Sequence, residues 1–422
     1  MAAHLPALLR EAPFRGYWAG RTLSQLGDQI RGLALPLTAV TALHAGGTAM
    51  GLLSAAGTLP SLAFALHAGA FVDRRGGRRQ IMLWADLGRA ALVAAVPALW
   101  AARRLSLPVL LALAFAIGVL SVLFRVASGT LFVALVPKER YVEASALLTQ
   151  GRAGAFLAGP ALGGALIQFL SAPVALLADG LSFLASALSL ARIRPEEPPP
   201  AMAGRGELLQ GVSAAWRSPI LRGLWLSGSV TALFKWVFMA LYVLYMTRDL
   251  HITPAEMGLI LGPSSIGAVA SALAVRSSAA RFGVGPTLVA GTALYTLPML
   301  AVPLAGGPHA LVVALLFAVE GTIAAGLMAM DVATAAIQAT AIADEVRSRV
   351  LGAFALTTTG LAPVGALLAA LGSAAFGVHA AIAVAAAGSC LGVAALFPAV
   401  AGLRRLEDTA LGEEGAAVAG PP

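Results

Sequence analysis

Ten charged side chains lie inside long apolar stretches of this sequence, where a charge needs a specific reason. Five are acidic (Asp28, Asp86, Asp179, Glu320 and Asp331) and five are basic (Arg31, Arg89, Arg125, Arg152 and Lys235). An ionisable group at the centre of a bilayer costs about 2.5–3.5 kcal/mol on insertion scales, so it usually pairs, binds cargo or carries a proton. The equal numbers predict pairing in a protein interior.

Two of these acids are candidates for binding a proton. Asp28 lies about ten residues into the first apolar stretch, with Arg31 one helical turn further on, and Glu320 lies near the middle of the tenth stretch. A carboxylate in a dry cavity holds a proton more readily, and an approaching arginine favours its release. We expect Arg125 to be that arginine for Asp28. Lys235 is a further candidate for coupling or substrate binding, or a counter-ion for an acid.

The other acids have plainer interpretations. Asp86 and Arg89 are three residues apart, which places them on one helix face and predicts a structural ion pair. Asp179 is predicted to make a local polar contact, and Asp331 to be solvated near a helix end.

Several classes of function are not expected. The single cysteine, Cys390, excludes a disulfide within the chain, and the histidines are not spaced for a metal. There is no phosphate-binding loop for ATP and no recognisable nucleophile–base pair. The net charge of +8 comes from short loops between apolar runs, which is typical of membrane topology and not of nucleic-acid binding. We therefore expect no enzyme, cofactor, metal or nucleic-acid partner.

The composition predicts an all-α membrane protein. Of 422 residues, 59% are apolar and only 11% charged, whereas soluble domains carry roughly 25% charged residues. A helix needs about 20 apolar residues to cross the hydrocarbon core. On that rule twelve spans are predicted, at 18–43, 48–72, 80–101, 107–135, 141–170, 174–193, 221–247, 254–276, 285–304, 308–334, 346–371 and 376–400.

Loop charges predict the orientation of these spans. One side receives 20 lysines and arginines, including Arg21, and the other receives 3. Because basic loops stay in the cytoplasm, both termini are predicted to be cytoplasmic, in a multi-pass protein of the inner (plasma) membrane.

The spans divide into two bundles of six. A Pro-rich, hydrophilic segment at 194–219 separates an N-terminal bundle, 1–193, from a C-terminal bundle with its tail, 220–422. A weak repeat supports this division. Its matching pairs, all 207 residues apart, are His44 and His251, Gly51 and Gly258, Arg74 and Arg281, and Arg140 and Arg347. Parallel repeats are typical of transporters whose halves move about a central site.

Two motifs carry a resemblance to the Major Facilitator Superfamily. From Gly69 the chain reads GAFVDRRGGRR, which resembles the superfamily's signature loop between the second and third spans. The matching residues are Gly69, Asp73, Arg74, Gly76 and Arg78. The resemblance implies a conformational switch in which Asp73 faces a helix start of the other bundle near Val346.

The second motif lies in the fifth span. Gly159, Pro160, Gly163 and Gly164 resemble the superfamily's antiporter motif, which is more frequent in exporters than in importers. Stretches at 24–28, 135–139 and 178–183 are similar to the branch with macrolide-efflux proteins, the enterobactin exporter and the lysophospholipid transporter. The resemblance implies two pseudo-symmetric six-helix bundles.

The leading functional expectation is a secondary transporter that exports small amphiphilic molecules, such as a drug or secondary metabolite, by proton antiport. Membrane lipid and protons are its expected partners, and we expect a monomer. The alternative is a lysolipid flippase of the same fold, without proton coupling.

Overall fold

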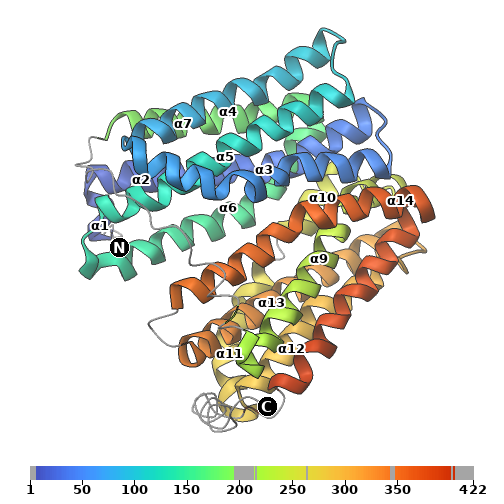
Figure 1. Cartoon of the computed structure of the whole chain (residues 1–422). Coiled ribbons are helices and arrows are strands. Elements are labelled where there is room, and N and C mark those ends of the chain that lie inside the picture. Colours follow the sequence, from blue (N-terminus) through green and yellow to red (C-terminus); the bar gives the residue numbers. More distant parts are fainter. Residues whose placement is uncertain are drawn as a thin grey trace, which may run out of the picture. The chain divides into compact units, whose positions relative to one another are not determined.

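The computed structural model describes residues 6–193, 213, 216–262, 265–342, 347–400 and 403, and these residues form helices with no β-strand (Figure 1). The chain divides into two compact units. Unit 1 contains Met1–Ala203 and His251–Gly262, and unit 2 contains Gly204–Leu250 and Pro263–Pro422. The predicted 194–219 segment lies almost entirely outside the described residues.

Unit 1 is an antiparallel bundle of long helices joined by short turns. Its α-helices are α1 (Ala7–Arg10), α2 (Ala12–Leu37), α3 (Gly47–Arg75), α4 (Arg78–Ala101), α5 (Leu107–Leu135), α6 (Tyr141–Leu170), α7 (Ala172–Ala191) and the short α10 (Pro254–Leu261). A π-helical turn, Thr38–Ala42, extends α2, and a 3₁₀ turn, Lys138–Arg140, precedes α6.

Unit 2 repeats this plan. Its helices are α9 (Pro219–Arg248), α11 (Ser265–Phe282), α12 (Val284–Thr296) with the 3₁₀ turn Leu297–Ala301, α13 (His309–Ala341) and α14 (Arg347–Val400). Gly377 interrupts α14 with a φ of 82°, a left-handed conformation that favours glycine. The break separates the predicted eleventh and twelfth spans.

Each predicted span has a helical counterpart in the described part of the chain, and the all-α, polytopic fold is confirmed. Two predicted spans, 107–135 and 141–170, coincide with α5 and α6. The eighth predicted span is divided between α10 and α11. Eight helical stretches are long and apolar enough to cross a membrane by length and composition, and one of them contains both halves of α14.

The backbone carries the 207-residue repeat seen in the sequence. His44 and His251 both have a positive φ, 52° and 54°, and each lies just before a helix, α3 or α10. Non-glycine residues rarely adopt this conformation. Gly76 and Gly283, also 207 residues apart, share a positive φ as well, at 62° and 97°. The same turns therefore recur at matching points of the two halves of the sequence.

Helix α2 is fixed in unit 1 by aromatic side chains near its start. The Tyr17 hydroxyl donates to the carbonyl oxygen of Ser128 on α5 at 2.9 Å. The Trp18 indole donates to the carbonyl oxygen of Leu147 on α6, also at 2.9 Å. Buried apolar residues of α1, α3, α4 and α7 surround Tyr17. These contacts hold the polar face of α2 in register with α5.

Candidate functional site

A polar cavity of about 330 Å³ lies within unit 1, lined by α2, α3, α4 and α5. Its polar lining residues are Arg21, Ser24, Gln25, Asp28, Arg31, Ser61, Arg89, Ser121, Arg125 and Ser128. Three of the five site residues predicted inside the membrane, Asp28, Arg31 and Arg125, are thus brought together in one cavity. The other two, Lys235 and Glu320, belong to unit 2.

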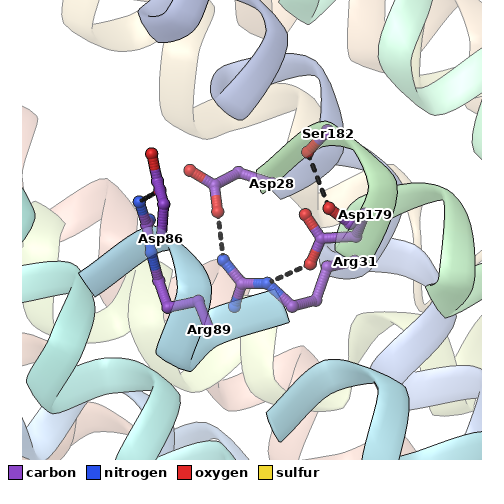
Figure 2. A network of polar contacts seen from close by, with 6 residues as sticks. All are labelled: Asp28, Arg31, Asp86, Arg89, Asp179 and Ser182. Carbon is purple, nitrogen blue, oxygen red and sulfur yellow. Dashed lines mark hydrogen bonds and ion pairs between the residues drawn. The ribbon is translucent and has the colours of Figure 1, made fainter. Parts of the chain in front are cut away.

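Asp28, Arg31 and Asp179 form a carboxylate–guanidinium–carboxylate triad (Figure 2). Arg31 donates through Nη2 to Asp28 and through Nε to Asp179 Oδ2, the latter at 2.9 Å. Asp28 is 36% exposed toward the cavity, whereas the Asp179 side chain on α7 has no exposure. The triad therefore connects the cavity with the buried interior of unit 1.

A second ion pair lies beside the triad. Arg89 and Asp86, both on α4, are buried and bonded to one another, as their spacing predicts. The Arg89 guanidinium lies between the rings of Phe124 and Phe183, 4.3 and 4.1 Å from their centroids. Because a desolvated guanidinium over aromatic faces gains cation–π attraction, this pair is fixed on both sides. We interpret it as structural.

The triad has one more negative than positive charge when both carboxylates are ionised. Two acids share one guanidinium, whereas the neighbouring Asp86–Arg89 pair is balanced. One oxygen of Asp179, Oδ1, is buried without a hydrogen-bond partner among the described residues. A buried, unpaired carboxylate oxygen is costly. A single proton on the triad removes the excess charge, so the arrangement is suited to taking up and releasing one proton.

In this structure Arg31, and not Arg125, is the ion-pair partner of Asp28, so the expected approach of Arg125 to Asp28 in another conformation stays a prediction. Arg125 on α5 donates to the Ser61 hydroxyl on α3 at 3.2 Å, and the ion pair of Asp28 is made by Arg31. Arg21, counted above among the loop cations, lies inside α2 and lines the cavity. It donates to the hydroxyls of Tyr17 and Ser128, at 3.2 and 3.1 Å.

The candidate residues of unit 2 lie apart from any such network. Glu320 on α13 is 8% exposed, and the Tyr242 hydroxyl of α9 lies beside it. The Lys235 ammonium lies 5.6 and 5.9 Å from the ring centroids of Trp236 and Tyr295. In the described part of unit 2, neither Glu320 nor Lys235 forms an ion pair.

The signature loop forms the turn between α3 and α4. Gly76 and Gly77 adopt positive φ angles of 62° and 59°, which let the chain reverse between the two helices. Arg78 begins α4 and is buried, whereas Arg74 lies in the last turn of α3 and is exposed. The side chain of Asp73 and residues 343–346 lie outside the described part of the chain, so the implied contact of Asp73 stays a prediction.

The glycines of the antiporter-like motif allow two close helix crossings on α6. A Cβ on Gly163 would lie 3.2 Å from Ile30 Cα of α2, and one on Gly164 would lie 2.9 Å from Gly258 Cα of α10. Pro160 lies on the same helix, four residues before Gly164, and is buried. The small residues therefore bring α2 and α10 against α6, as small residues do at membrane helix interfaces.

We expect Gly164→Ala to destabilise unit 1 because the added methyl group meets backbone atoms of α10, which cannot rotate away. Overpacking of this kind costs about 1–3 kcal/mol. Gly154→Ala on the same helix is the matched control, since its Cβ would have no neighbour within 4 Å. Thermal unfolding of the purified proteins in detergent compares them. Equal melting temperatures for the two variants would contradict the crossing.

The helical architecture and the buried polar site define the class: this is a polytopic membrane transporter with the fold of the Major Facilitator Superfamily. The model of one family, described as "Transmembrane secretion effector", matches residues 4–413. The chain belongs to this family, and it is a transporter and not an enzyme.

Named relatives and solved structures are similar to most of the chain. The multidrug efflux pump Tap of Mycolicibacterium fortuitum is 27% identical over 78% of this chain and 81% of its own length. The Tap pump of Mycobacterium tuberculosis (strain ATCC 25618 / H37Rv) is 28% identical over 85% of this chain and 86% of its own length.

Two solved structures share the fold. A bacterial homologue of the iron transporter ferroportin, inward-facing, is 16% identical with a TM-score of 0.74, over 93% of this chain and 99% of its own. A bacterial homologue of the lysosomal transporter Spinster is 13% identical with a TM-score of 0.67, over 96% and 98%.

Proposed function

We propose that this protein exports small amphiphilic molecules by proton antiport with alternating access. The observation that carries the proposal is the triad of Asp28, Arg31 and Asp179 at the wall of the unit 1 cavity. Two carboxylates that share one guanidinium provide a group whose charge changes with a single proton. The names of the similar Tap pumps support efflux as the direction.

Of the two acids in the triad, Asp28 is the one that reaches the cavity. The other charged groups around the cavity are Arg21 on α2, Arg89 on α4 and Arg125 on α5, which line it, and Asp86, which is bonded to Arg89. Asp86 and Arg89 neutralise one another, and α3 contributes the uncharged Ser61. Asp28 reaches the cavity and Asp179 does not, so a proton would enter through Asp28.

Efflux from whole cells tests this function. Cells expressing the chain should accumulate less of a fluorescent dye, and the panel contains anionic carboxyfluorescein and cationic rhodamine 6G. For the dye that is exported, an uncoupler and Asp28→Asn should each restore accumulation. Arg152→Gln is the control, because Arg152 stacks on Phe156 outside the cavity. Uncoupler-insensitive efflux of every exported dye would contradict proton coupling.

Glu320 is the second candidate for the proton group. It is a buried acid in unit 2 with Tyr242 beside it and no cation paired with it among the described residues. Glu320→Gln is therefore tested in the same assay. If it abolishes efflux and Asp28→Asn does not, the proton site belongs to unit 2. If neither variant alters uphill efflux, the passive lysolipid flippase gains support, and movement of labelled lysolipid in proteoliposomes tests it.

We expect both termini and the 194–219 segment to be cytoplasmic, because basic loops stay on that side. Cysteines placed singly at Gly204 and Gly306 should react with an impermeant reagent from opposite faces of the membrane. The native Cys390 is half-buried and is first replaced by serine. Labelling of both positions from outside intact cells would refute this orientation.

The signature loop supplies the proposed conformational switch. We expect Asp73→Asn to slow transport severalfold while membrane insertion and melting temperature are retained, because the carboxylate would stabilise one closed state at a helix N-terminus of the other half. Transport rates in proteoliposomes at matched protein content measure this. A normal rate would leave Gly69, Arg74, Gly76 and Arg78 with a role in topology only.

A further inference from the structure

In the described part of the chain, two of the four arginines that line the unit 1 cavity have no carboxylate bonded to them. Arg31 and Arg89 are each bonded to an aspartate, whereas Arg21 and Arg125 donate only to hydroxyl groups in the described part of the chain. We propose that Arg21 and Arg125 bind an anionic group, a carboxylate, sulfonate or phosphate, on the amphiphilic cargo. This inference rests on the proposed function and specifies its substrate class.

The charge of the cavity supports an anionic ligand. Four arginines line it, and the acids bonded to them or lining it are Asp28, Asp86 and Asp179, which leaves one positive charge in excess. A proton on the triad raises that excess to two. A charge in a membrane interior is costly without a counter-charge. Because no carboxylate among the described residues bonds Arg21 or Arg125, the cargo is suited to supply the counter-charge.

The hydroxyl groups around these arginines complete a site for oxyanions. Ser121 and Ser128 lie four residues before and three residues after Arg125, on the same face of α5, and both line the cavity. The Ser121 hydroxyl is buried and has no hydrogen-bond partner among the described residues. Ser61 bonds Arg125 from α3. Guanidinium and hydroxyl groups are all donors, and a planar guanidinium matches carboxylate and phosphate oxygens in a bidentate arrangement.

The apolar part of the cavity lining favours an amphiphile over a simple inorganic anion as the ligand. Leu35, Ala114, Gly118 and Phe124 line the same cavity beside the polar groups. An apolar body can lie against these residues while the anionic head reaches the arginines. An anion that leaves the cell also moves in the direction that an inside-negative membrane potential favours, which agrees with export.

Binding to the purified full-length protein tests the inference without any gradient. The protein is kept in an uncharged maltoside detergent, and ligand affinity is measured from the shift in melting temperature. The anionic probes are 1-naphthyl phosphate, a soluble aromatic, and lysophosphatidate, a lipid. Dodecyltrimethylammonium is the cationic control. Both anions, or one of them, should bind, and the cation should bind more weakly. Selectivity for lysophosphatidate would identify a lipid as the source of the anionic head, and selectivity for naphthyl phosphate a soluble metabolite or drug.

The variants assign the binding to the two arginines. Arg125→Gln should weaken binding of the anionic probe about tenfold, as expected for the loss of one charge-assisted hydrogen bond. Arg21→Gln should also weaken binding of the anionic probe about tenfold. If that variant unfolds, Arg21→Lys, which keeps the charge, is measured in its place. The control Arg152→Gln should bind as the parent does. Unchanged anion affinity in Arg125→Gln, or equal affinity for the cationic control, would overturn the inference.

The result of the anion-binding test can be told apart from the result of the proton-coupling test. If anion binding fails while uncoupler-sensitive dye efflux persists, the substrate class is wrong and the proposed function stands. If binding succeeds while efflux is insensitive to uncouplers, the anion site stands and the coupling is wrong.

Discussion

Asp179→Asn is expected to abolish uphill transport while leaving downhill exchange of the cargo intact. The asparagine leaves Arg31 paired with Asp28 alone and gives the triad no excess charge, so it resembles the protonated state permanently. One pH unit corresponds to about 1.36 kcal/mol, so one exchanged proton can sustain a cargo ratio of about tenfold. In the variant the ratio should fall to about one.

Proteoliposomes with a pH gradient of one unit measure this ratio. The membrane potential is clamped at zero with potassium and valinomycin, so that the charge of the cargo does not contribute. Ser182→Ala is the matched control on α7, because the Ser182 hydroxyl bonds the backbone of Asp179 and not its carboxylate. A parental ratio in Asp179→Asn would remove Asp179 from the coupling mechanism.

Arg89→Met is expected to be the most destabilising single change in unit 1. It leaves the carboxylate of Asp86 buried without its cation, and such an unpaired charge costs about 3–5 kcal/mol. It also removes the cation–π contacts with Phe124 and Phe183. At roughly 2–4 °C per kcal/mol for a unit of this size, the melting temperature should fall by about 10 °C.

The double variant Asp86→Leu/Arg89→Met separates a structural pair from a generally intolerant site. Replacing both members of a buried ion pair by apolar residues is often nearly neutral, so most of the lost stability should return. Arg152→Met, on an exposed arginine of α6, should melt close to the parent. A double variant as unstable as Arg89→Met would show that the pair is not the source of the effect.

The membrane spans could be predicted from the sequence because the bilayer sets both their length and their composition. The predicted spans 107–135 and 141–170 coincide with α5 and α6. Prediction was weaker where a helix carries charges or a break. Helix α2 begins at Ala12, six residues before the predicted span, since Arg15 and Arg21 lower its hydropathy. The split between α10 and α11 falls at Gly262 and Pro263, a helix-breaking pair that a rule based on apolar length alone passes over.

The candidate site was predictable only where partners are close in the sequence. Spacing of three residues on one helix predicts the pairing of Asp86 with Arg89 and brings Asp28 near Arg31. Asp179 is 148 residues from Arg31, and only the packing of α7 against α2 joins them. Periodicity cannot give such a contact. The only signal for this contact in the sequence was a single acid, Asp179, within an otherwise apolar span.

The coupled movement of protons tests the central claim most directly. A pH-sensitive dye trapped in proteoliposomes reports proton flux when an outward gradient of the exported cargo is applied. We expect the parent to move protons opposite to the cargo. Asp28→Asn should still exchange cargo for cargo but move no protons, and Arg152→Gln should behave as the parent does. Cargo-dependent proton flux that persists unchanged in Asp28→Asn would contradict the proposal that the triad of Asp28, Arg31 and Asp179 carries the proton.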